Sequence, residues 1–267
     1  MGLDSGRGPI QLRVKSLSII LLNQVFYFYP LLLLALIWEL GTALELIGDD
    51  VLPRLDLVLI SFWQGLSDGD LLKHTAISLF RVLSGLIISF ILGVALGLLT
   101  GLSRRWDSYL MPLLVGTQAV PRSALLPLFI VWLGFGETQK LVVIVSVAFF
   151  PIMINTYEGL KRVNECHIWA ARSMGYNDRN VVFLVKIPSV LPYIFSGIRI
   201  AVPMSVTMMV IAEMVGAVSG LGQFVIVAGQ TYQLAEMFAG IVLLGLMGML
   251  LDRVADYLGR VTMPWRD

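Results

Sequence analysis

The hydrophobic residues of this chain fall into six long runs separated by polar stretches. The runs lie at about 18–47, 77–101, 108–133, 139–158, 190–214 and 234–258. An α-helix of about 20 apolar residues crosses a hydrocarbon core of about 30 Å, and each run is long enough for that. The pattern therefore predicts an all-α integral membrane protein with six transmembrane helices. The stretch 48–76 is more polar and contains Pro53, so we expect an interfacial segment there.

The composition supports a membrane protein and excludes several kinds of site. The 267 residues are 57% hydrophobic and only 14% charged, with a mean hydropathy of +0.84, whereas soluble domains carry about 25% charged residues. A net charge of +1 gives no reason to expect a nucleic-acid partner. The single cysteine, the two distant histidines and the lack of a G-x4-GK[S/T] loop predict no metal, nucleotide or other cofactor in this chain.

The positions of Lys and Arg predict the orientation in the membrane. With the N-terminus inside, the inner segments hold Arg7, Arg13, Lys15, Arg104, Arg105, Lys161, Arg162, Arg172, Arg179, Lys186, Arg253, Arg260 and Arg266. The outer segments hold only Arg54, Lys73, Arg81 and Lys140. We therefore expect a multi-pass protein of a cell membrane with both termini and residues 159–189 in the cytoplasm. Residues 1–17 would form a tail, and 18–267 a single transmembrane domain.

Small residues recur at every fourth position of the second run. The members of this stripe are Gly85, Ser89, Gly93, Gly97 and Gly101. Such spacing places them along one side of a helix and lets a neighbouring helix approach closely. Two interpretations remain open, a central helix in a bundle that moves and ordinary helix packing; both bury this helix among others.

Residues 159–189 form a polar island between two apolar runs. Residues 161–174 have a helical pattern, and Gly175 is placed to end that helix. Asn177 or Asp178 can cap a second short helix over 181–187, which Pro188 should end. The residues alone leave two interpretations equally open: a hairpin lying on anionic lipid, or a hairpin that inserts into a groove of another protein.

The spacing within the island resembles the EAA loop of binding-protein-dependent ABC importer permeases. Ala170-Ala171, Gly175, Val185 and Ile187-Pro188 match that pattern. The chain has Trp169 where the family usually has glutamate, and Glu165 lies one helical turn earlier. The resemblance implies that the hairpin docks on a cytoplasmic ATPase. The residues implied in this coupling are Glu165, Trp169, Ala170, Ala171, Gly175, Ile187 and Pro188.

Further stretches resemble the nitrate/sulfonate/taurine/bicarbonate subfamily of these permeases. They include HTAISLFRVLSGLIISFILGVALGLLTGLSRRWD, VPRSALLPLFIVWLGFGETQK, FFPIMINTYEGLKRV and LPYIFSGIRIAV. The resemblance implies a type I importer fold in a bacterial inner membrane and a permease that performs no chemistry. It implies a homodimer, two ATPase subunits that hold ATP and Mg²⁺, and an extracytoplasmic solute-binding protein. The solute would be a small anion; riboflavin, a pyrimidine precursor or an aromatic acid is the alternative.

Polar residues inside the predicted spans are candidates for the translocation path. Arg122, between Pro121 and Pro127, could attract an anion, or it could pair with Glu213 or bond to backbone carbonyls. Asn155 could line a gate or bond to a neighbouring helix. The full set of candidates is Gln118, Arg122, Asn155, Ser205 and Glu213.

Two other arginines are expected to have structural positions. Arg81, at the outer edge of its span, should reach the lipid headgroups, and Arg199 should extend to the inner interface. The glycine-rich stretch after Glu213, VGAVSGLGQF, could be an outer gate loop or merely a turn.

Two other function classes fit the sequence less well. A secondary transporter should show inverted repeats and acidic residues at mid-depth for ion coupling. A membrane-embedded enzyme should show a cluster of His, Asp or Glu at one depth. The sequence shows neither pattern, so the importer permease is the favoured interpretation.

Overall fold

A computed structural model describes residues 29–30, 32–48, 51–118 and 120–265. It divides the chain into two compact units, 1–61 and 62–267, which are described separately. No strand occurs among the described residues, so the prediction of an all-α chain is confirmed. The predicted tail 1–17 and the first part of the predicted span 18–47 lie outside the described residues. In the first unit, Trp38 of helix Leu32–Ala43 donates from its Nε1 to the carbonyl of Pro53, which lies after this helix, at 2.9 Å.

Helix α2, Leu55–Ser67, crosses the boundary between the units. It falls within the stretch predicted to be interfacial, and its 13 residues are too few to cross a bilayer. Only Val58 of this helix is buried.

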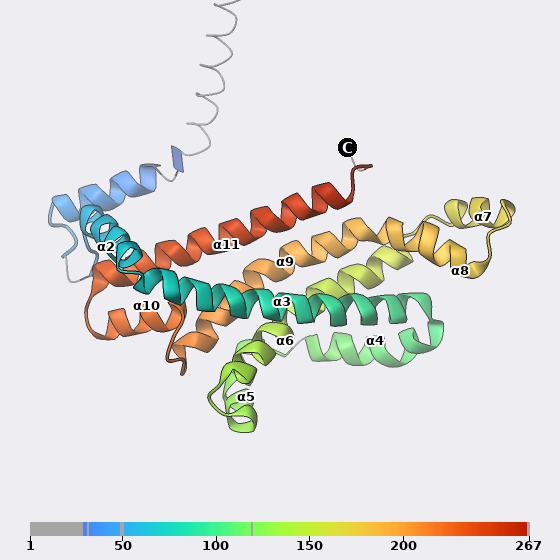
Figure 1. Cartoon of the computed structure of the whole chain (residues 1–267), viewed down its shortest axis with the longest axis horizontal. Helices are drawn as coiled ribbons and strands as arrows, with labels where there is room; N and C mark the ends of the chain where they lie inside the picture. The colour runs from blue at the N-terminus through green and yellow to red at the C-terminus, as the bar shows by residue number, and fades with distance from the viewer. Residues whose placement is uncertain (1–28, 31, 49–50, 119, 266–267) are drawn as a thin grey trace, which may run out of the picture. The chain divides into compact units, whose positions relative to one another are not determined.

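Among the described residues of the second unit, four helices are long and apolar enough to cross a membrane. They are α3 (Asp70–Leu102), α6 (Glu137–Lys161), α9 (Ile187–Met214) with the turns that precede it, and α11 (Leu234–Thr262). They confirm four of the predicted spans, and Figure 1 shows them as long rods. Helix α6 makes its most extensive contacts with α3 and α9, so these three helices form the centre of the unit.

The small-residue stripe of α3 is the surface on which α6 packs. A Cβ atom added to Gly97 would lie 2.7 Å from the Met153 carbonyl and 2.6 Å from Thr156 Cβ. Gly85 approaches Ile144, and Gly101 approaches Leu160, in the same way. Contacts this short leave no room for a side chain, so the stripe sets the α3–α6 distance.

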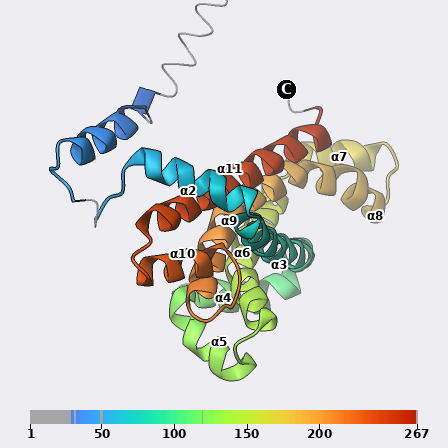
Figure 2. The ribbon, with the colours of Figure 1, turned by 60° about the vertical axis from the view of Figure 1, so that its left-hand side comes forward.

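The predicted span over 108–133 is not one continuous helix. The chain instead forms α4 (Arg104–Gln118), a 3-10 turn (Arg122–Leu125) and α5 (Leu126–Leu133), with a bend of 88° between the two parts. The physical reason is Pro121, which cannot donate a helical hydrogen bond and disfavours helical geometry in the residue before it. Figure 2 shows α5 turned away from the direction of α4.

Helix α10, Leu221–Gln230, is a short apolar helix between α9 and α11. It packs against α3, α9 and α11. Figure 1 shows α10 near one end of α9, while the short helices α7 (Glu165–Ser173) and α8 (Asp178–Val181) lie at the other end. The second unit therefore has two distinct polar ends, joined by the long helices.

Candidate functional site

The polar island folds as the helical hairpin that the sequence predicts. Helix α7 begins at Asn164, whose side chain accepts a hydrogen bond from Cys166 N–H at 2.9 Å. It ends at Gly175, which has φ +87°, a conformation that glycine adopts at little cost. Gly175 N–H donates to the Arg172 carbonyl at 2.9 Å and Tyr176 N–H to the Ala171 carbonyl at 3.2 Å. These two bonds form a Schellman motif, so the predicted stop at Gly175 is confirmed.

The second half of the hairpin differs from the prediction at Pro188. Asn177 caps α8 by accepting from Asn180 N–H at 2.9 Å, as expected. The helix then passes through a π-helical turn, Val182–Lys186, into α9 without a break. Ile187 N–H bonds to the Val182 carbonyl, and this wider turn precedes Pro188, which stands in the first turn of α9, where its missing N–H is tolerated. Pro188 therefore begins α9 and does not end the second short helix.

The surface of the hairpin carries large apolar side chains. Trp169 is 61% exposed and Met174 71% exposed, and Phe183 and Leu184 on the second arm are similarly open. Ala171 is buried within the hairpin, whereas Ala170 and Glu165 are exposed. Glu165 and Trp169 are four residues apart on α7 and so share one face. That face, with a carboxylate beside an indole, is suited to contact with another protein.

Ile187 lies at the base of the hairpin, beside Pro188, and both are partly buried. Helix α6 is joined to α4 at the same end of the unit. Tyr157 Oη donates to Asp107 Oδ1 at 2.9 Å, and Lys161 Nζ lies 2.7 Å from Asp107 Oδ2. The base of the hairpin is therefore connected to α4 as well as to α9.

Arg122 lies at the break between α4 and α5. Its Nη2 donates to the Thr117 carbonyl at 2.7 Å, and its guanidinium carbon lies 4.2 Å from the centre of the Phe150 ring on α6. Arg122 therefore bonds to a backbone carbonyl, that of Thr117, which is one of the two structural partners considered for it. The other, Glu213, has different partners. The guanidinium has five N–H donors, and only this one bond is formed within the described part of the chain.

The other candidate path residues either form hydrogen bonds within their own helices or are exposed. Asn155 Nδ2 donates to the Pro151 carbonyl at 2.8 Å, and Ser205 Oγ donates to the Ala201 carbonyl at 2.7 Å. Gln118 is exposed at the end of α4. The structure does not bring Gln118, Asn155 or Ser205 into contact with Glu213, which is fully buried elsewhere. Their role in a path stays a prediction.

The expectation that Arg81 reaches the lipid headgroups is wrong, because Arg81 is only 2% exposed. Its Nε lies 2.6 Å from Glu137 Oε2 and its Nη2 2.5 Å from Glu137 Oε1. Its Nη1 donates to Glu213 Oε1 at 2.6 Å and to the Ser219 carbonyl at 2.7 Å. Two carboxylates and a carbonyl thus draw this arginine into the protein. We call Arg81, Glu137, Glu213 and Ser219, with Ser78 and His74 of α3, the end cluster.

The end cluster also holds the start of α10. Three successive backbone N–H groups there are bound by side chains from α3 and α9: Gly220 by His74 Nδ1 at 2.9 Å, Leu221 by Ser78 Oγ at 2.8 Å and Gly222 by Glu213 Oε2 at 2.8 Å. Ser78 Oγ in turn donates to the Glu213 carboxylate at 2.9 Å. Sequence reasoning missed this cluster. The available signal was the spacing of His74, Ser78 and Arg81, which places them along one side of α3.

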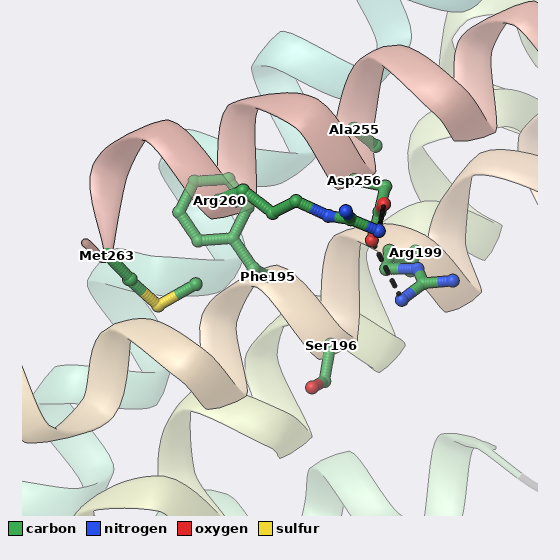
Figure 3. Close-up of a pocket in the computed structure, with 8 residues that line it drawn as sticks. Phe195, Ser196, Arg199, Ala255, Asp256, Arg260 and Met263 are labelled. Atoms are coloured by element: carbon green, nitrogen blue, oxygen red, sulfur yellow. Dashed lines mark ion pairs between the residues drawn. The ribbon is translucent and has the colours of Figure 1, made fainter. Parts of the chain in front are cut away.

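A polar pocket of about 330 Å³ lies between α9 and α11, near their hairpin-side ends. Arg199 Nη1 lies 3.1 Å from Asp256 Oδ1, and Arg260 Nη2 lies 2.7 Å from Asp256 Oδ2. Figure 3 shows the two guanidinium groups converging on this one carboxylate. Arg199 was expected to extend to the inner interface and to be structural; it pairs with Asp256 of α11, and Asp252 lies 3.9 Å from its Nε.

Comparison with known proteins identifies the relatives of this chain. The family described as the binding-protein-dependent transport system inner membrane component matches residues 89–263. The aliphatic sulfonates transport permease protein SsuC of Bacillus subtilis, which is described as putative, is 34% identical over 231 residues, covering 86% of this chain and 84% of SsuC. The taurine transport system permease protein TauC of Escherichia coli is 33% identical over 240 residues, covering 88% of this chain and 87% of TauC.

A solved structure has the same fold. The inward-facing MetNI methionine ABC transporter superposes with a TM-score of 0.61 and 21% sequence identity, over 72% of this chain and 95% of that chain. At this identity the likeness concerns the fold alone. It agrees with the expected type I importer arrangement of long helices and a helical hairpin.

Proposed function

The chain belongs to the family of inner-membrane components of binding-protein-dependent transport systems, and we propose that it conducts a small sulfonate across the membrane. As a member of this family it is the multi-pass permease subunit of an ATP-driven importer, and it is not an enzyme. We also propose its orientation in the membrane, the residues that contact its partners and the number of copies.

The observation that carries the coupling proposal is the hairpin 159–189. It leaves the bundle, folds on itself through a Schellman turn and returns into α9 as one continuous helix. Four large apolar side chains on it are more than half exposed: Trp169, Met174, Phe183 and Leu184. Clustered exposed apolar residues mark interaction sites. The hairpin thus supports a docking role on a cytoplasmic ATPase that binds ATP and Mg²⁺.

We place Trp169 at the centre of that contact. An exposed indole brings a large apolar area and little loss of conformational entropy, and tryptophan is enriched among the residues that dominate binding energy. Glu165, on the same face of α7, supplies the carboxylate that the usual motif has at position 169. The ATPase groove would then receive an apolar ring flanked by an acid, where relatives with glutamate present an acid alone.

Arg122 supports an anionic solute. The Phe150 ring covers one face of its guanidinium, and the Thr117 carbonyl accepts one N–H. These two contacts fix the group in place and leave its remaining N–H donors available for a solute. A guanidinium presents donors in a planar fork that suits oxyanions such as a sulfonate. The names of two relatives, one for aliphatic sulfonates and one for taurine, agree with this solute class.

The remaining parts of the proposal concern assembly. Helix α4 has no buried residue although much of it is apolar, so either lipid or another protein surface covers it. In a homodimer the second permease copy would cover it, with the path between the copies and Arg122, Gln118, Asn155 and Ser205 close to it. The hairpin and both termini would be cytoplasmic, and a solute-binding protein would deliver ligand to the end cluster side.

Reconstitution tests the function. The permease, its ATPase and the binding protein encoded beside it would be placed in liposomes, with taurine and ethanesulfonate as probes. We expect ATP-dependent uptake of radiolabelled taurine, competed by ethanesulfonate and unaffected by riboflavin. Uptake of riboflavin in place of both sulfonates would contradict the solute class. Uptake without ATP would contradict the importer mechanism.

A further inference from the structure

The end cluster joins two loops that are far apart in the sequence. We propose that Glu213 is a positioning residue that keeps loop 215–220 and the first turn of α10 closed against α3 in the resting transporter. This proposal rests on the proposed importer function. It assigns to the end cluster the task of closing the end of the permease opposite the hairpin, and of releasing that end once in each transport cycle.

The start of α10 is held by two kinds of contact, the buried Leu221 side chain and the acceptors of the end cluster. The helix has only ten residues, and isolated helices shorter than about 12 residues are marginal. Leu221 is fully buried in the apolar core, and the two glycines on either side of it add no further side chain. A Cβ atom on Gly222 would lie 2.6 Å from the Val210 carbonyl, and one on Gly220 would overlap the Glu213 carboxylate. The three backbone N–H groups of this turn therefore depend on the end cluster for their hydrogen bonds, and the Glu213 carboxylate lies against the turn.

The same arginine holds the second loop. Gly134, Phe135 and Gly136 connect α5 to α6, and Glu137 follows them as the first residue of α6. Arg81 binds Glu137 with two nitrogens, and it binds Glu213 and the Ser219 carbonyl with a third. The loops also lie against each other, since a Cβ atom on Gly216 would meet the Phe135 ring at 2.5 Å. One guanidinium thus joins the start of α6, directly after loop 134–136, to loop 215–220.

A cluster of this kind is costly if its only task is packing. Buried ion pairs in a bilayer protein are expensive, and apolar side chains of similar volume often stabilise a fold better. Hydrogen bonds and ion pairs have another property, because they can exchange protein partners for water when a loop lifts. A bond that exists in only one of two states favours that state by its own free energy. Removal of Glu213 should therefore shift the transporter towards the state in which this end is open.

The test uses the whole transporter in nanodiscs and the substitution Glu213→Gln. The carboxamide keeps the size of the side chain and loses the charge that holds Arg81. We expect ATP hydrolysis without binding protein to rise about tenfold, and stimulation by loaded binding protein to fall correspondingly. Ser78→Ala, which removes one bond to Glu213 and one to Leu221 N–H, should give a smaller change of the same sign. Glu236→Gln is the matched control, because no ion pair of Glu236 occurs among the described residues.

A second readout follows the loop itself. Ala228 of α10 is 2% exposed, and Ala228→Cys with Cys166→Ser gives a single thiol there. We expect a charged maleimide to label it about tenfold faster when Glu213→Gln is added. Unchanged labelling and an unchanged ratio of stimulated to basal hydrolysis, in a fully assembled complex, would overturn the proposal. Lack of stimulated hydrolysis in the unaltered transporter would instead refute the proposed function, so the two failures can be told apart.

Discussion

Arg81 Nη1 and Glu213 Oε1 lie 2.6 Å apart across the contact between α3 and α9, and both side chains are at most 2% exposed. Removing one partner of a buried ion pair leaves the other without a countercharge. Arg81→Leu should therefore lower the free energy of unfolding by about 3–5 kcal/mol. Thermal denaturation in detergent would measure the loss. Arg162→Leu is the control: its pair with Glu158 at 3.7 Å is exposed, and its loss should cost below about 1 kcal/mol. Equal losses of stability in Arg81→Leu and Arg162→Leu would show that burial does not strengthen the Arg81 ion pairs.

The close approach of α6 to α3 predicts a steric effect at Gly97. A valine there would place Cβ against the Met153 carbonyl and Thr156, and backbone cannot move aside as a flexible side chain can. We expect Gly97→Val to destabilise the protein by about 1–3 kcal/mol. The same substitution at Gly245, where nothing lies within 4 Å of an added Cβ, should have little effect. Melting temperatures of the two variants in the same detergent make the comparison.

Gly175→Trp should leave the permease in the membrane and abolish transport. The added side chain has open space around it, but the φ of +87° would cost an L-residue about 1–2 kcal/mol and distort the hairpin turn. Gly69 has φ +82° and equally open space, so Gly69→Trp controls for backbone strain away from the hairpin. Uptake and substrate-stimulated ATP hydrolysis are the measurements. Normal stimulated hydrolysis with Gly175→Trp would remove the coupling role of the hairpin.

Trp169→Ala should weaken assembly with the ATPase. Truncation of a central tryptophan commonly costs about 2 kcal/mol or more, which corresponds to roughly 30-fold in the dissociation constant. Trp132→Ala alters an indole that is exposed to a similar degree but lies on α5, and should leave assembly unchanged. Titration of fluorescent ATPase onto permease in nanodiscs would measure both. Equal affinity for Trp169→Ala and the unaltered chain would show that the indole does not make this contact.

Arg122 allows a test of solute charge. Arg122→Gln should reduce taurine uptake, and Arg122→Lys should retain part of it, because lysine keeps the charge but not the planar fork stacked on Phe150. Initial uptake rates over a range of taurine–binding protein concentrations give the apparent KM and maximal rate. If both substitutions lower uptake to the same degree, and the amount of assembled complex falls in parallel, Arg122 has a packing role.

The sequence was informative where local chemistry determines the structure. The helix stop at Gly175 and the cap at Asn177 depend on a few neighbouring residues, and the small-residue stripe of α3 depends on a four-residue spacing. The end cluster was missed because its partners come from distant segments: 56 residues separate Arg81 from Glu137 and 132 separate it from Glu213. From the sequence, an arginine at the end of a span is expected to contact lipid headgroups. That expectation cannot take account of acidic partners that only the folded structure brings close to it.

Two prolines show the limit of reading breaks from sequence. Pro121 lies at a sharp break in the predicted span 108–133. Pro188 was expected to end a helix, but the helix continues through it, because a π turn before Pro188 accommodates its ring. The ring has the same local effect in both places. The surrounding packing decides whether the chain bends or continues.

The π turn has a mechanical consequence. Because it joins α8 to α9 without a break, residues Asp178–Met214 form one helix of 37 residues, about 55 Å long at 1.5 Å per residue. The hairpin occupies one end of this rod, and Glu213 stands at the other. A tilt of about 5° about the hairpin end would displace the far end by about 5 Å over that length, more than any hydrogen bond of the end cluster can stretch. In the proposed mechanism, a small movement of the hairpin on the ATPase would therefore break the hydrogen bonds of the end cluster at the opposite end of this helix.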